Sequence, residues 1–128
     1  MRKAEFGKRK AEKDMKTELE GRTKRFSLEL MATLRGFPKG YLGEVIGRQL
    51  LKSGTSIGAN YREANRAESR ADFVHKVSLA EKEAAETVYW LELCLAAGLG
   101  ASAEIQKLTQ EPGELLAILT TIGRNSKK

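Results

Sequence analysis

The apolar residues of this chain recur at intervals of three and four along most of its length, a pattern typical of amphipathic helices. Four such segments lie at about residues 16–35, 41–65, 70–97 and 102–124. Because short connections separate them, the pattern predicts an all-α fold, an antiparallel up-down four-helix bundle. The apolar positions of the first, third and fourth segments are Leu19, Phe26, Leu30, Met31 and Leu34; Phe73, Val77, Ala80, Ala84, Val88, Leu91 and Leu95; and Ile105, Leu108, Leu115, Leu116, Leu119 and Ile122.

Glycine, proline and capping residues mark the ends of the first and third segments. Gly36 and Pro38 end the first, since glycine tolerates the backbone that follows a helix and proline cannot continue one. Ser69 is placed to cap the third segment, with Asp72 three residues on near the positive end of the helix dipole. Gly98 ends that segment.

The two ends of the chain and the fourth segment are less regular. Residues 1–15 have little apolar periodicity and predict a flexible basic tail, and residues 126–128 predict a second short one. Ser102 is placed to cap the fourth segment. Pro112 and Gly113 interrupt that segment, so we expect a kink or a short break near residue 112.

The second segment divides into two faces when it is placed on a helix at about 100° per residue. Two glycines one turn apart, Gly54 and Gly58, allow a neighbouring helix to approach closely, which offsets the roughly 0.5–1 kcal/mol that each interior glycine costs. The small and apolar face holds the helix-packing residues Gly47, Gly54, Ile57 and Gly58. The opposite face holds the basic residues Arg48, Lys52, Arg62 and Arg66.

The basic face has two interpretations. It is a solvated surface with local ion pairs, such as Glu44 with Arg48, or it faces an anion, above all a nucleic-acid backbone. A nucleotide-binding loop is disfavoured, because Lys52 precedes the glycine where the phosphate-loop pattern requires it to follow. Structural roles are expected for Ser56, Asn60 and Glu63, with Asn60 hydrogen-bonding across the bundle.

Charge is concentrated at the two ends of the 128-residue chain, whose net charge is +6. Residues 1–25 carry +5, residues 26–123 carry −2 and residues 124–128 carry +3. Basic ends contact nucleic acid in many proteins, although they can also serve only for solubility. The further candidates for phosphate contact are therefore Arg22, Lys24, Arg25 and Arg124.

Catalytic and metal-binding patterns are weak in this sequence. His75 is the only histidine, and the acidic cluster at residues 81–86 lacks the Glu-x-x-His motif of di-metal bundles. We therefore expect no enzyme activity, no metal and no cofactor. Cys94 cannot form an internal disulfide and is expected to be buried, which fits a reducing cytoplasm. No apolar run reaches the roughly 20 residues of a membrane span.

Residues 49–64 resemble the signature of a bacterial four-helix-bundle family that includes proteins encoded in ribosomal-RNA intervening sequences. Residues 34–39, Asp72 with Phe73, and residues 86–93 resemble the same family, so the similarity covers roughly residues 22–123. The resemblance implies a ring-shaped homopentamer, and kinship with retroelement accessory proteins that bind nucleic acid together with a reverse transcriptase. Pro112 with Gly113 and the basic N-terminal extension depart from the family's pattern.

Two hypotheses about function follow. The first is a non-enzymatic, oligomeric nucleic-acid-binding accessory protein that contacts the backbone of RNA or DNA through its basic residues. The second is a structural or protein-interaction scaffold that has no nucleic-acid role.

Overall fold

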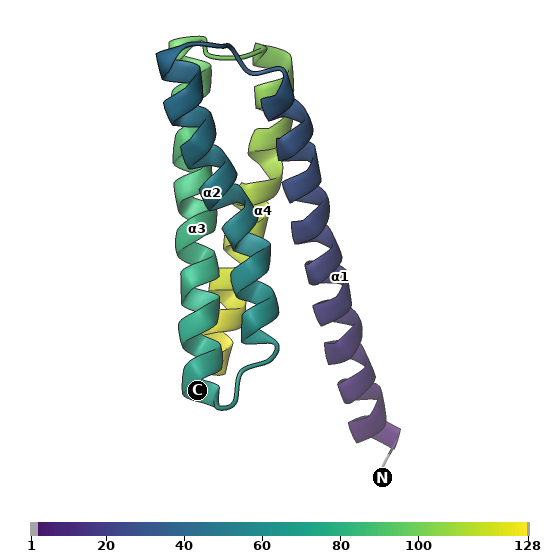
Figure 1. Ribbon diagram of the computed structural model, residues 1–128. Helices are drawn as coiled ribbons and strands as arrows, with labels where there is room; N and C mark the ends of the chain where they lie inside the picture. Colours follow the sequence, from purple (N-terminus) through teal and green to yellow (C-terminus); the bar gives the residue numbers. More distant parts are fainter. Residues whose placement is uncertain (1–2, 128) are drawn as a thin grey trace.

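The computed structural model of the protein describes residues 3–127; residues 1–2 and Lys128, the outermost parts of the two predicted tails, lie outside the described residues. Four helices follow one another: α1 (Lys3–Arg35), α2 (Tyr41–Ala64), α3 (Arg70–Ala97) and α4 (Ser102–Ser126). Successive helices run in opposite directions (Figure 1). Helix α3 packs against both α2 and α4, and α1 packs against α2 and more sparsely against α4. The predicted antiparallel four-helix bundle is confirmed.

The core is built from the apolar stripe of each helix. Its largest fully buried side chains include Phe26 and Leu30 of α1, Tyr61 of α2 and Leu91 of α3, together with Leu115 of α4. Burying such a side chain contributes about 1.5–3 kcal/mol, so the stripes that the sequence displays also hold the helices together. None of the helices in residues 3–127 is apolar over a length sufficient to cross a membrane.

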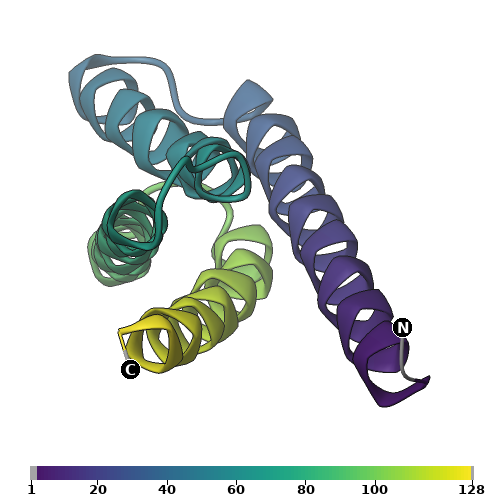
Figure 2. The ribbon, with the colours of Figure 1, turned by 90° about the horizontal axis from the view of Figure 1, so that it is seen from below.

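Helix α1 is longer than the sequence pattern predicts. It begins at Lys3, so the predicted boundary at residue 16 is wrong. Residues 3–18, which we call the N-terminal arm, diverge from the other helices toward the N-terminus (Figures 1 and 2). Every residue from 7 to 18 is exposed, which is why the arm shows no apolar periodicity. Strong helix formers such as Lys, Glu, Ala and Met extend the helix from its packed part without a new nucleation step.

Two of the predicted signals at helix ends are confirmed by the structure. The Ser69 side chain accepts a hydrogen bond of 3.0 Å from the Asp72 backbone N–H and caps α3. Gly98 follows α3 with a φ of 66°, a left-handed conformation that favours glycine. Ser102, in contrast, is the first residue of α4 rather than its cap, since Ala101 holds the cap position and no side chain bonds there.

Helix α4 runs through Pro112 without the predicted break. Proline has no N–H for the carbonyl of the residue four positions earlier, Leu108, and normally disrupts a helix at that point. Here Pro112 is itself buried, as are Leu108 and Leu115 on the same side of the helix. The packing of this apolar side against the bundle therefore keeps the helix continuous.

Candidate nucleic-acid interface

The outer face of α2 carries three of the four basic residues that the sequence places on one side of this helix, and the fourth, Arg66, lies in the turn just after α2 ends at Ala64. Arg48, Lys52, Arg62 and Arg66 are all exposed in the structure. At 1.5 Å per residue the distance along α2 from Arg48 to Arg62 is about 21 Å. We call these four residues the α2 basic stripe. Their side chains meet solvent because the opposite side of α2 is packed into the bundle.

Two of the stripe's arginines, Arg48 and Arg62, form ion pairs with neighbouring glutamates. Arg48 Nη2 lies 2.9 Å from Glu44 Oε1, and both side chains are largely exposed, so the predicted pair is present. Arg62 Nη1 lies 4.0 Å from Glu20 Oε1 on α1. Exposed pairs of this kind contribute about 0–1 kcal/mol, so a phosphate group can replace the carboxylate at little cost.

Lys24 of α1 joins the stripe across the α1–α2 boundary. Together with Arg62 it lines a shallow hollow of about 240 Å³ between the two helices. The hydroxyls at its wall, those of Thr23, Ser27 and Thr55, each donate to a backbone carbonyl of their own helix. Their protons are therefore engaged, and the cationic groups that face this hollow are those of Lys24 and Arg62.

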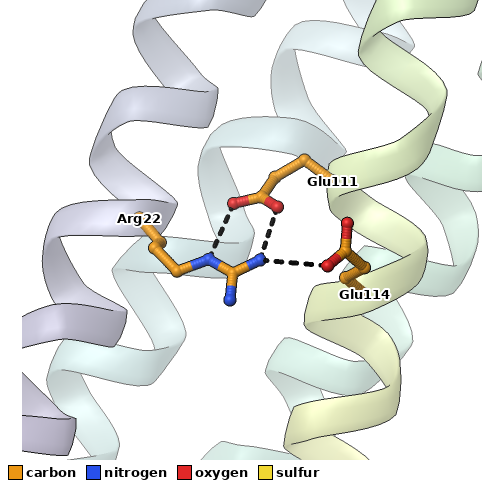
Figure 3. A network of polar contacts seen from close by, with 3 residues as sticks. All are labelled: Arg22, Glu111 and Glu114. Atoms are coloured by element: carbon orange, nitrogen blue, oxygen red, sulfur yellow. Dashed lines mark hydrogen bonds and ion pairs between the residues drawn. The ribbon is translucent and has the colours of Figure 1, made fainter.

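Arg22 lies on a different side of α1 from the α2 basic stripe. Figure 3 shows its guanidinium bound by two hydrogen bonds to the Glu111 carboxylate of α4, at 2.9 Å from Nε and 2.6 Å from Nη2. Glu114 lies 3.8 Å from the same nitrogen, Nη2. The hydrogen bond with Glu111 raises the pKa of Arg22 above its ordinary value. Arg22 thus joins α1 to α4, and its predicted place among the phosphate-contacting residues is not supported.

Arg25 and Arg124 also lie apart from the stripe. Arg25 lines the groove between α1 and α4 with Arg22, where acidic and basic side chains are mixed. Arg124 is exposed near the end of α4, a helix that packs on α3 and α1. Of the predicted candidates, Lys24 is the one that tertiary structure brings to the stripe.

The glycines of α2 position the stripe by bringing α1 close. A Cβ on Gly58 would lie 2.9 Å from Thr23 Oγ1 and 3.0 Å from Thr23 Cβ, and one on Gly54 would overlap the Leu30 side chain. Gly47 faces Phe37 in the same way, at 3.3 Å, and Ile57 is fully buried. The predicted close approach is confirmed, with α1 as the partner helix.

The polar residues of α2 divide between local and cross-helix contacts. Asn60 Nδ2 donates to the Ser56 carbonyl at 2.9 Å, within α2, so the expected bond across the bundle is not the one that forms. Ser56 Oγ in turn donates to the Lys52 carbonyl. Glu63 does cross to α3, where it lies 3.7 Å from Lys76 Nζ.

A buried hydroxyl pair joins α2 to α3, and the sequence analysis missed it. Thr87 Oγ1 lies 2.9 Å from Ser53 Oγ, and both residues are fully buried. The signal available in the sequence was a small polar residue at a core position of each helix. Ser53 Oγ accepts from the Thr87 hydroxyl and itself lies 3.5 Å from the Leu50 carbonyl, and Thr87 Oγ1 also lies 2.8 Å from the Glu83 carbonyl. Each hydroxyl therefore has a partner, whereas an unpaired one would destabilise the core.

Several exposed apolar residues lie on the first two turns of α2 and on the last three turns of α3. These residues, which we call the apolar end group, are Tyr41, Leu42, Val45, Tyr89 and Leu93, and Tyr41 is 80% exposed. The two helix ends lie side by side at the top of Figure 1. Large apolar side chains exposed on neighbouring helix ends are candidates for contact with another protein.

The residues that bear reactive side chains do not gather in one place. Cys94 is buried, and burial raises the pKa of its thiol. His75 is exposed on α3. Within residues 3–127 no group of three or more His, Cys, Asp and Glu side chains is arranged to hold a metal ion.

Comparison with known proteins identifies similar sequences and folds. A family model described as 23S rRNA-intervening sequence protein matches residues 16–121. The crystal structure of a protein of unknown function from the S23 ribosomal protein family of Bacteroides thetaiotaomicron is 34% identical, with a TM-score of 0.74. That similarity covers 81% of this chain and 96% of the other. No curated protein matches the chain significantly.

Proposed function

This chain belongs to the family of 23S rRNA-intervening sequence proteins. From that premise we propose that it is a non-enzymatic, oligomeric accessory protein that binds RNA or DNA. The observation that carries the proposal is the α2 basic stripe with Lys24 beside it. Three cations on the exposed face of α2, with Arg66 just after the helix and Lys24 of α1 beside them, suit an extended polyanion such as a nucleic-acid backbone better than a single bound anion.

The chemistry of this face is that of phosphate contact. Guanidinium and ammonium groups remain charged at neutral pH and donate strong hydrogen bonds to phosphate oxygens. The nearby hydroxyls are engaged with helix carbonyls, so the cations carry the interaction. Such contacts bind without selecting a base sequence, and they require no catalytic residue.

Fluorescence anisotropy with labelled 30-mers of single-stranded RNA, single-stranded DNA and duplex DNA tests the proposal. The variant Arg62→Gln with Arg66→Gln removes two charges of the stripe. The control Lys82→Gln with Lys107→Gln removes two exposed charges from α3 and α4. A lost charged hydrogen bond is worth about 1.5 kcal/mol, so we expect affinity to fall roughly tenfold or more in the first variant alone. Absence of binding to all three probes at 50 mM salt, or equal losses in both variants, refutes the proposal.

The apolar end group favours self-assembly and a second candidate function. We propose that it packs against other copies of the chain, as a homopentamer according to the family resemblance. Native mass spectrometry tests this: Leu42→Glu with Leu93→Glu should dissociate the oligomer and retain its helical circular dichroism. A monomeric wild-type protein at micromolar concentration contradicts self-assembly.

The alternative to nucleic-acid binding is a scaffold that recruits a protein through the same apolar end group. A reverse transcriptase is the class of partner that the resemblance implies. A pull-down that yields the same protein partner before and after nuclease treatment, combined with absent binding in the anisotropy assay, favours the scaffold over the nucleic-acid role.

A further inference from the structure

The N-terminal arm of α1 combines positive charge, full exposure and a fixed direction. Residues 7–18 hold five basic residues against three acidic ones, and all twelve are exposed. The family match begins at residue 16, so most of the arm lies outside the part of the chain shared with the family. The arm also extends past the packed part of α1 rather than folding back on the bundle (Figure 1).

Three lysines of the arm, Lys10, Lys13 and Lys16, lie in the sector of α1 that is centred on Glu20, the side that adjoins α2 farther along the helix. Glu20 identifies that side, since its carboxylate accepts a hydrogen bond from Asn65 and reaches Arg62. At about 100° per residue the three arm lysines fall within roughly 80° of Glu20 around the helix. Lys8, in contrast, lies about 120° away from Glu20, on another side of the arm.

The arm lysines continue the basic surface that α2 and Lys24 begin. From Lys10 to Lys24 the distance along α1 is about 21 Å, and Lys24 shares its hollow with Arg62. At the end of the bundle where α3 begins and α4 ends, Lys16 lines a second hollow together with Arg70 of α3, Glu12 of the arm, and Asn125 and Ser126 of α4. Lys24 of α1 thus shares one hollow with Arg62 of α2, and Lys16 of α1 shares another with Arg70 of α3, although these residues lie far apart in the sequence.

We infer that the N-terminal arm is a second nucleic-acid-contacting element, which holds the phosphate backbone together with α2 through Lys10, Lys13 and Lys16. The inference rests on the proposed nucleic-acid function. A helical arm presents its lysines at fixed spacing, whereas a disordered tail would lose conformational entropy on binding. The arm thus increases the number of phosphates that one chain neutralises.

The dependence of affinity on salt measures this number. Each phosphate contact on B-DNA contributes about 0.9 to the slope of log K against log salt concentration, and about 0.7 on a single strand. The full-length triple variant Lys10→Gln, Lys13→Gln and Lys16→Gln should therefore reduce the magnitude of the slope by about 3 on duplex DNA, or about 2 on a single strand. Glutamine favours the helix about as well as lysine, so the arm should keep its helical circular dichroism.

A matched pair of single variants distinguishes the effect of a lysine's position on the arm from the effect of the protein's net charge. Lys13→Gln and Lys8→Gln each remove one charge from the arm, on different sides of the helix. We expect affinity to fall severalfold in the first and to change little in the second. Equal losses in both, or an unchanged slope in the triple variant while Arg62→Gln with Arg66→Gln still weakens binding, overturn the inference and leave the proposed function standing. If the wild-type protein binds none of the probes, the proposed function itself fails.

Discussion

Adding one methyl group at Gly58 tests the close contact of α1 and α2. In Gly58→Ala the new Cβ would lie 2.9 Å from Thr23 Oγ1 and 3.0 Å from Thr23 Cβ. Thr23 is buried, is β-branched and donates its hydroxyl to the Glu20 carbonyl, so it cannot rotate away freely. The helices must separate slightly to accept the methyl group.

The size of the effect follows from two opposing terms. Overpacking a well-packed contact costs about 1–3 kcal/mol, whereas replacing glycine by alanine within a helix gains about 1 kcal/mol. We therefore expect Gly58→Ala to lower the free energy of unfolding by about 1 kcal/mol. Gly113→Ala is the matched control, because a Cβ there meets no atom within 4 Å. It should raise the free energy of unfolding by about 1 kcal/mol.

Chemical denaturation followed by circular dichroism measures both variants. The test is whether the two variants change the free energy of unfolding in opposite directions, because the gain in helix propensity from glycine to alanine is the same at both positions. Thr23→Ala should partly relieve Gly58→Ala in a double-mutant cycle by removing the hydroxyl that the new methyl group meets. If Gly58→Ala stabilises the protein as much as Gly113→Ala does, the argument for a close helix crossing is refuted.

Three further outcomes are expected. Arg22→Lys removes the paired hydrogen bonds to Glu111, in a site where both side chains are less than a third exposed. In urea titrations this variant should have a free energy of unfolding about 1–2 kcal/mol lower than that of the wild type. An unchanged free energy of unfolding would mean that the pair does not hold α1 to α4. Burial, and then the neighbouring Glu86, raises the pKa of Glu83 in the folded state above its ordinary 4.5, so the folded protein binds more protons and stability should fall as pH rises through the window just above 4.5. Glu83→Gln should reduce that slope, and an identical pH profile contradicts this assignment. Cys94 should resist a thiol reagent at pH 8 in the folded protein and react fully in guanidinium, because it is buried with a raised thiol pKa; rapid labelling of the folded protein would show that the site opens.

Local signals in the sequence were sufficient for most of the helix boundaries. Ser69 and Gly98 act through contacts within a few residues, which is why the limits of α3 could be read from the sequence. The start of α1 could not, because apolar periodicity reports packing and the N-terminal arm has none. Its helix-forming composition was the signal that mattered there.

Pro112 shows how packing overrides a local rule. Taken alone it predicts an interruption, since its ring removes one backbone hydrogen bond. The apolar side of α4 that contains Pro112 is buried, and the stabilisation from this burial exceeds the cost of the missing backbone hydrogen bond. Only the tertiary structure decides this balance, because it depends on what lies opposite the helix.

For the candidate nucleic-acid interface, too, some features follow from the sequence alone and others only from the tertiary structure. The sequence alone determined which residues of α2 share a face, because the geometry of one helix follows from its spacing; Arg48 and Gly58 could thus be placed on different sides. Where neighbouring helices lie was decided by the tertiary structure. It pairs Arg22 with Glu111, although 89 positions separate them, and it brings Lys24 beside Arg62. Side chains on different helices meet only after the helices have packed, and that packing depends on all four apolar stripes together.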